Sequence, residues 1–309
     1  SHWLILFSTS CFANLLGLNI SSSFNSVKVI YILIPICIIP QLLFSGIIVP
    51  YDKLHPYFSS KSHVPTIGNV MASRWAYEAM AVEQYQNNKF EKPLFNYHKL
   101  QSDIDYKLAY FIPELKRKTN LCLTLKNDVS PENKAELKKN LSVIHKALKE
   151  DNSRLKKDQQ FARVDELNPE EFTTEVVMDL KKYLRSLNDF YSEYFADVNE
   201  LIDGKKSALF VVDGEDKYNE YRDKYANESL KDVVRNVNST DKIGIEGSKI
   251  VQFTDPIYAK PRPSSLLDYR AHFYAPQKHF LGYYFDTYYF NILVIWLFTF
   301  VFYITLYFD

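Results

Sequence analysis

The sequence predicts a mainly α-helical membrane protein that carries a large, mostly helical, water-soluble insert. Among all Lys, Arg, Asp and Glu residues, only Lys28 and Asp309 lie outside residues 52–286. Residues 29–51 and 287–308 are charge-free and rich in Ile, Leu, Phe and Tyr. At about 1.5 Å per helical residue, each stretch is long enough to cross the roughly 30 Å hydrocarbon core of a bilayer.

A third uncharged segment, residues 3–20, is near the lower length limit for a membrane span, and its alternative is a buried helix of a soluble protein. We therefore expect about three spans, at residues 3–20, 29–49 and 287–308. Pro35 and Pro40 fall inside the second, where neighbouring groups can satisfy the freed carbonyls.

The chain opens without Met, directly on an apolar run, and shows neither the basic start nor the cleavage site of a signal peptide. We expect it to be the C-terminal piece of a longer polypeptide.

The sequence divides into three predicted parts: residues 1–97, the soluble insert 98–270, and the final segment 271–309. In the first part, residues 70–80 have apolar groups at helical spacing, with Trp75 and Tyr77 suited to a headgroup region. This stretch is too polar to span. We expect a short helix that lies at, or dips into, the membrane edge.

Within the insert, SPE at residues 130–132 and NPEE at 168–171 predict helix starts, because each places a capping side chain before proline and acids. Residues 208–212 suggest a short strand, and KPRP at 260–263 suggests an extended linker near the end of the insert. Apolar residues recur every three or four positions after the second start: Phe172, Val176, Leu180, Leu184 and Leu187. Four tyrosines before and within the last span predict an aromatic belt: Tyr283, Tyr284, Tyr288 and Tyr289.

No motif predicts catalysis. The sequence has no Gly-rich phosphate loop, no serine in a nucleophile context, and scattered histidines that suggest no metal site. The acids of the insert fit the solvated faces of helices. A net charge of zero gives no reason to expect nucleic acid as a partner. We predict neither catalytic nor metal-binding residues in this chain.

Two motifs around the second span carry a resemblance: LFSGIIVP at residues 43–50 and SRWAYEA at residues 73–79. Together they resemble the ABC-2 type permease of the G subfamily of ABC transporters. Members of that family end their fifth transmembrane helix with FSG, two bulky aliphatic residues and V, and then carry a short re-entrant helix. The last segment is also similar, with FDT at 285–287, FN at 290–291, IW at 295–296 and LYF at 306–308.

The resemblance implies a permease that works as a dimer in an ATP-driven exporter of the inner membrane. The three spans would be the fourth to sixth helices, and residues 98–270 would lie outside the cytoplasm. The ATPase domain, with its ATP and Mg, would precede the chain, which itself would hold no cofactor. The long insert departs from common family members. It resembles fused ATPase–permease proteins of some Gram-negative bacteria, in which it would be a periplasmic docking or substrate-handling domain. The partners implied are the upstream ATPase domain, a second copy, membrane lipid and a periplasmic protein.

The resemblance also names site residues. Ile47 and Ile48 match the hydrophobic plug at the dimer axis, and Ile38 and Leu42 match cavity-facing positions. An apolar constriction excludes water and ions until the helices part. The alternative is that all four only face lipid or pack. In the re-entrant helix, the motif residues are Arg74, Trp75, Tyr77 and Glu78.

Two other classes of function stay open. A membrane-anchored interaction protein would use the spans as anchors and the insert to bind a partner. In that case the polar residues and prolines of the spans would have no pathway to line. An enzyme with its active site in the insert is the second alternative, and no constellation of residues supports it. A nucleotide-binding motif upstream of the chain would favour transport, and its absence would favour an anchor.

Overall fold

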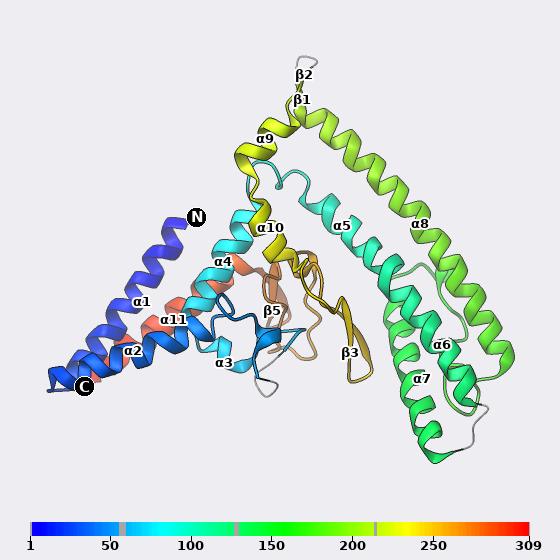
Figure 1. The fold of residues 1–309 in the computed structure, drawn as a ribbon, viewed down its shortest axis with the longest axis horizontal. Helices are drawn as coiled ribbons and strands as arrows, with labels where there is room; N and C mark the ends of the chain where they lie inside the picture. The colour runs from blue at the N-terminus through cyan, green and yellow to red at the C-terminus, as the bar shows by residue number, and fades with distance from the viewer. Residues whose placement is uncertain (1, 56–59, 127–129, 213–214, 309) are drawn as a thin grey trace. The chain divides into compact units, whose positions relative to one another are not determined.

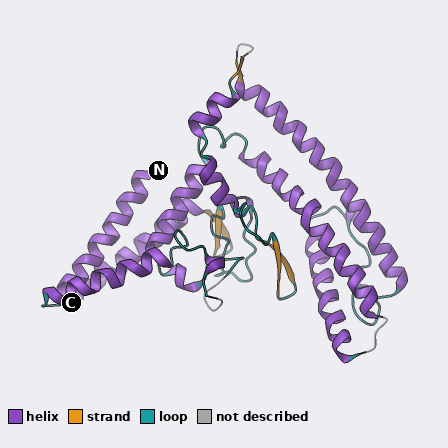
Figure 2. Ribbon diagram, viewed as in Figure 1, coloured by secondary structure: helices purple, strands orange, loops and turns teal. Residues whose placement is uncertain are grey.

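The computed structural model describes residues 2–55, 60–126, 130–212 and 215–308, and most of them are helical (Figure 2). The predicted mainly helical fold is thereby confirmed. The chain forms two compact units. Unit 1 comprises residues 1–93, 219–238 and 255–309, and unit 2 comprises residues 94–218 and 239–254.

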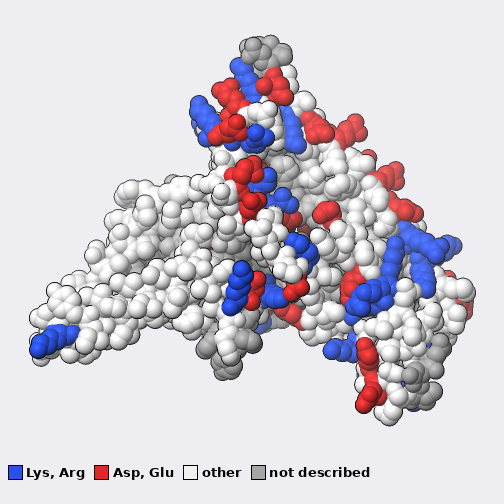
Figure 3. All heavy atoms as spheres, viewed as in Figure 1, with Lys and Arg blue, Asp and Glu red and all other residues white. Residues whose placement is uncertain are grey.

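The apolar helices of unit 1 are α1 (His2–Ser23), α2 (Val27–Leu43) and α11 (Thr287–Phe308). Helix α1 packs along α11, and α4 (Ala72–Gln86) packs against both (Figure 1). Helices α1 and α11 are long and apolar enough to cross a membrane, whereas α2 has 17 residues. Figure 3 shows very few charged side chains over these helices, in contrast to the rest of the visible surface.

The second apolar stretch is not helical to its predicted end. Helix α2 ends at Leu43, and the N–H of Phe44 donates to the Pro40 carbonyl. The Ser45 hydroxyl donates to the Leu42 carbonyl at 2.9 Å, so a side chain satisfies a backbone acceptor of the last turn. Gly46 has φ of +77°, a left-handed conformation that glycine adopts without strain. Residues 44–49 therefore form a turn, and the helical part of predicted span 29–49 stops at Leu43.

The remainder of unit 1 consists of a hairpin and several short elements. Strands β5 (Gln277–Phe280) and β6 (Tyr283–Asp286) form an antiparallel hairpin that leads directly into α11. Tyr283 and Tyr284 therefore lie on a strand before the span, while Tyr288 and Tyr289 lie within the helix. The other elements of unit 1 are short: η1 (Tyr51–Lys53), α3 (Thr66–Asn69), most of α9 (Tyr218–Tyr225), α10 (Glu228–Arg235) and η5 (Pro256–Tyr258).

Unit 2 is a helical assembly whose core lies between α6 (Ile112–Lys126), α7 (Pro131–Asn152) and α8 (Thr174–Phe210). The predicted start of α7 is confirmed, since the Ser130 hydroxyl accepts from the N–H of Asn133. The predicted periodicity is also confirmed, because these α8 residues are all at most 3% exposed: Val176, Leu180, Leu184 and Leu187. The remaining short elements are η3 (Lys157–Gln159), η4 (Val164–Glu166), β1 (Val211–Val212) and β2 (Glu215–Asp216).

Two predicted boundaries of α8 are wrong. The helix begins at Thr174, capped by the Thr173 hydroxyl, because Asn168 instead folds a turn by accepting from the N–H groups of Glu170 and Glu171. At the other end the helix continues to Phe210, so only the last two residues of the expected strand, Val211 and Val212, are extended.

Helix α5 (Phe95–Tyr106) continues into α6 through a π-helical turn, η2 (Lys107–Phe111). The Lys107 amine forms an ion pair with buried Asp151 on α7, and lies 3.7 Å from the centre of the Phe111 ring. The turn thus has a specific partner, Asp151, in unit 2.

A second hairpin, β3 (Ile243–Glu246) with β4 (Lys249–Gln252), belongs to unit 2 and packs against α7. The compact units therefore divide the chain differently from the predicted insert. Residues 219–238 and 255–270, assigned from the sequence to the insert, belong to unit 1 with the apolar helices.

Candidate functional site

A cluster of buried polar side chains joins α4, β5 and α11 within unit 1. Glu78 at its centre is fully buried and accepts from Lys278 Nζ at 2.5 Å and from Asn291 Nδ2 at 2.8 Å. The Arg74 guanidinium lies 3.3 Å from the same carboxylate. These four residues, each at most 2% exposed, form what we term the polar junction.

Local structure explains how four distant residues meet. Arg74 and Glu78 are four residues apart on α4 and therefore lie on one face of the helix. Asn291 occupies the second turn of α11, where its amide also donates to the Trp75 carbonyl at 3.0 Å. Tyr274, just before β5, has φ of +71°, and its N–H points at Glu78 at 3.3 Å. Such a strained conformation for a bulky residue persists only where its surroundings fix it.

The electrostatics of the junction depend on one anion serving two cations. Burial alone would raise the pKa of Glu78, but the charges of Arg74 and Lys278 outweigh it and lower that pKa. Burial lowers the pKa of Lys278 to about 8, against the opposing attraction of Glu78. Charged groups away from water require such pairing, so the junction fixes α4, β5 and α11 to one another.

The turn after α2 rests against the same region through Tyr51. A Cβ atom built on Gly46 would lie 2.5 Å from the Tyr51 ring, and one on Gly68 would lie 2.6 Å from its hydroxyl. Only glycine fits at either position without moving the tyrosine. The Tyr51 hydroxyl donates to the Phe44 carbonyl at 3.1 Å, and the Arg74 guanidinium interacts with it. Gly46 of the FSG motif thus leaves the space in which the Tyr51 ring packs, beside Arg74 of the polar junction.

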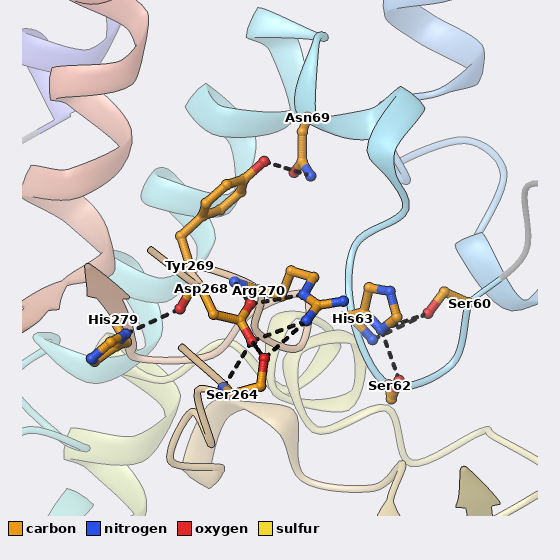
Figure 4. Close-up of polar contacts among 9 residues, drawn as sticks. All are labelled: Ser60, Ser62, His63, Asn69, Ser264, Asp268, Tyr269, Arg270 and His279. Atoms are coloured by element: carbon orange, nitrogen blue, oxygen red, sulfur yellow. Dashed lines mark hydrogen bonds and ion pairs between the residues drawn. The ribbon is translucent and has the colours of Figure 1, made fainter. Parts of the chain in front are cut away.

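A polar loop, residues 264–270, contacts β5, the strand that carries Lys278 (Figure 4). Asp268 accepts from Arg270 Nε at 2.7 Å and from the Ser264 hydroxyl at 2.6 Å. Its backbone carbonyl lies 3.1 Å from Nδ1 of His279 on β5. The bonds from Arg270 lower the pKa of Asp268 despite its burial. The loop and the hairpin therefore form one connected structure.

The structure places the predicted site residues in two environments. Arg74, Trp75 and Glu78 are buried, and Trp75 donates through Nε1 to the Asn69 carbonyl at 2.8 Å. Tyr77 is half-buried, against the rings of Phe273 and Tyr274. The four predicted pathway residues are exposed in this single chain: Ile38 and Leu42 on α2, and Ile47 and Ile48 in the turn beyond it.

Helix α2 meets α4 through a polar link beside the predicted pathway residues. The Ser73 hydroxyl donates to the Gln41 carbonyl at 2.6 Å, and the Ser73 N–H donates to Gln41 Oε1 at 3.2 Å. Leu42 is the next residue on α2, and Arg74 is the next residue on α4. The link therefore lies directly beside one predicted pathway residue, Leu42, and one residue of the polar junction, Arg74.

Sequence reasoning did not assign three residues of this site: Tyr51, Lys278 and Asn291. A signal for Asn291 was present, because an amide inside a charge-free apolar span is costly unless it has a partner. Lys278 gave no comparable signal, since its burial depends on the register of the hairpin.

Residues 1–82 match the family model of the ABC-2 type transporter. The match covers α1, α2, α3 and most of α4, and it confirms the ABC-2 resemblance for this segment. No curated protein and no solved structure matches the chain.

Because one anion serves two cations, removing the anion and removing one cation should lower the free energy of unfolding by unequal amounts. Glu78→Gln leaves two buried cations without a counter-charge, and we expect a loss of about 3–5 kcal/mol in the free energy of unfolding. Lys278→Met leaves the Arg74–Glu78 pair neutral, so its loss should be smaller. Denaturant unfolding of the whole chain in detergent, followed by circular dichroism, measures both. Glu83→Gln on the same helix is the control, and equal losses at Glu78 and Lys278 would contradict the assignment.

The environment of His272 predicts a dependence of stability on pH. Burial lowers the pKa of His272 to about 4, and the nearby cations Arg262 and Lys278 add to this effect. Between pH 6.5 and 4 the unfolded chain binds a proton that the folded chain does not, so stability falls as pH decreases through this range. The full pKa shift corresponds to a decrease of about 3 kcal/mol in the free energy of unfolding. Unfolding of the wild type and of His272→Gln between pH 4 and 7 tests this. A constant difference between the two proteins would exclude His272 as the cause.

Proposed function

We propose, from the match of residues 1–82 to the ABC-2 type transporter family, that this chain is the permease part of an ATP-driven ABC exporter of the G-subfamily type. ABC-2 domains are membrane components of transporters that work with an ATPase partner. The two long apolar helices support a membrane location. In this proposal the ATPase binds ATP, while the present chain lines part of the substrate pathway.

The surface of α2 supports assembly with a second copy. None of its residues, all of which the structure describes, is buried, although the helix is almost entirely apolar. Lipid can cover part of such a helix, but in the proposed dimer the exposed Ile38 and Leu42 face the shared pathway. Ile47 and Ile48 then form an apolar constriction between the inner cavity and the exit.

The polar junction gives this pathway a mechanical connection. Glu78 binds groups from α4, β5 and α11, so in this proposal these elements move as one body. The Ser73 hydroxyl of α4 donates to the Gln41 carbonyl of α2, so this hydrogen bond attaches α2 to α4 and its partners. Movement of α4 on ATP binding would therefore displace α2 and open the constriction.

The constriction is tested by Ile47→Ala combined with Ile48→Ala in the complete transporter. We expect basal ATPase activity or proton leak from pyranine-loaded liposomes to rise several-fold, since smaller side chains let water enter. Ile32→Ala with Ile36→Ala is the matched control, because both residues are exposed on α2 away from the proposed plug. Unchanged leak and ATPase activity in the Ile47/Ile48 protein would rule out the plug.

The alternative is a membrane-anchored docking protein whose unit 2 binds a partner outside the cytoplasm. The size of unit 2 and its own hydrophobic core favour a separate role for it. This alternative predicts normal partner binding and no ATP-dependent transport. Loss of transport on removing the ATPase partner would decide for the exporter.

Both functions place unit 2 outside the cytoplasm, which cysteine labelling can test. We expect Glu200→Cys, at an exposed position of α8, to react with an impermeant maleimide in intact cells, or in spheroplasts where an outer membrane blocks access. Lys28→Cys, in the first turn of α2, should stay protected because the rest of α2 would separate it from the insert. Cys11, Cys37 and Cys122 are replaced by Ala in this background. Protection at residue 200 with labelling at residue 28 would reverse the topology.

A further inference from the structure

Exposed apolar side chains cover the tip of the β5–β6 hairpin and the loop that precedes it. Leu281 at the tip is 56% exposed, and Tyr283 beside it is 71% exposed. In the preceding loop, Leu266 and Leu267 are 67% and 61% exposed. Single exposed leucines are ordinary, but a contiguous group of large apolar side chains marks an interaction surface. We term these four residues the apolar tip.

The four residues are held together by the backbone. The N–H of Leu281 donates to the Leu266 carbonyl at 2.7 Å, and a Cβ atom on Gly282 would lie 3.6 Å from the Leu266 side chain. The bonds of Asp268 to Ser264 and Arg270 fix the same loop (Figure 4). The apolar tip is therefore a built surface of unit 1.

The backbone at the tip would favour a different residue. Leu281 has φ of +52°, a left-handed conformation in which glycine and asparagine are common and leucine is rare. The β3–β4 hairpin of the same chain has an equally short turn, but its tip is polar: Glu246, Gly247, Ser248 and Lys249. An exposed leucine at a strained turn, more than half accessible, is not explained by packing inside unit 1.

The hairpin lies alongside the beginning of the last apolar helix. The Phe280 ring, next to the tip, is 6.2 Å from that of Phe290. Residue 290 is three residues into α11, about 4.5 Å along its axis. The apolar tip is thus near the level of the first turn of α11. The same part of that helix also exposes large apolar side chains, since Tyr289 and Leu293 are 66% and 65% exposed.

We propose that the apolar tip inserts into the boundary between headgroups and acyl chains of the bilayer, as a second anchor beside α11. The position of the tip beside the first turn of an apolar helix with exposed side chains identifies the partner as lipid. The residues beside the apolar tip are of the types found at membrane–water interfaces, because the Lys260 amine lies 4.8 Å from the centre of the Tyr284 ring. In lipid the exposed leucines are buried, which offsets the strained backbone at Leu281. The inference requires α11 to cross the membrane but does not depend on transport.

Spin labels measure the depth of the tip directly. The whole chain, with its three cysteines replaced by Ala, carries a label at Leu281→Cys or Leu267→Cys in nanodiscs of phosphatidylcholine and phosphatidylglycerol. Lys249→Cys on the polar hairpin is the aqueous reference, and Leu293→Cys on α11 is the lipid reference. We expect the ratio of oxygen to nickel-chelate accessibility at 281 and 267 to exceed that at 249 several-fold.

Every other outcome overturns the inference. A ratio at 281 equal to that at 249 would place the tip in water. Protection from both reagents would show that protein covers it. If the ratio stays high at 293 while 281 is aqueous, the span survives and only the inserted tip is lost. An aqueous 293 would instead remove the membrane helix, and with it the proposed function.

Leu281→Asn separates lipid insertion from a structural role of the leucine. Asparagine suits the left-handed backbone, so unfolding in detergent should occur at the same or a higher temperature. In nanodiscs the same substitution should lower the accessibility ratio of a label at residue 267. An unchanged ratio at 267, with the fold intact, would show that Leu281 does not drive insertion.

Discussion

The architecture of unit 1 depends on one carboxylate that is kept away from water. Glu78 is stable as an anion in apolar surroundings only because cations and an amide donor surround it. Those partners come from its own helix, from a hairpin 200 residues later, and from the last apolar helix. The requirement to neutralise one charge therefore determines which distant segments meet. It also makes the junction specific, since an apolar side chain would accept several packing arrangements.

This constraint connects regions of the chain that differ in composition. Lys278 lies on the strand that follows the polar loop, and Asn291 lies on the helix that follows the hairpin. The chain is thus attached to α4 just before it enters its last apolar helix. On the other side, Gly46 and Gly68 accommodate Tyr51, so this tyrosine joins the turn after α2 to α3.

Much of the fold follows from local sequence patterns. The absence of charge placed all three apolar helices, and proline after Ser130 placed the start of α7, because these effects act within a few residues. The end of α2 was predicted six residues too late, since hydropathy does not register the positive φ of Gly46. The motif SRWAYEA identified Arg74 and Glu78, but their partner Lys278 is buried through the register of a hairpin that no local pattern predicted. Residues 219–238 were assigned to the insert for a similar reason, because their association with unit 1 is determined by tertiary contacts.

The π-turn η2 has a consequence for how unit 2 uses its long helices. One additional residue in a helix rotates everything beyond it by about 100° around the axis. On the α5 side of η2, Ile104 packs with Val198 and Ile202 in the C-terminal half of α8, whereas α6 packs with α7 and the N-terminal half of α8. A regular helix in place of η2 would turn one of these two apolar stripes towards solvent. The irregular turn therefore changes the direction in which the apolar side chains point. As a result, the continuous helix formed by α5, η2 and α6 contributes to two separate hydrophobic clusters.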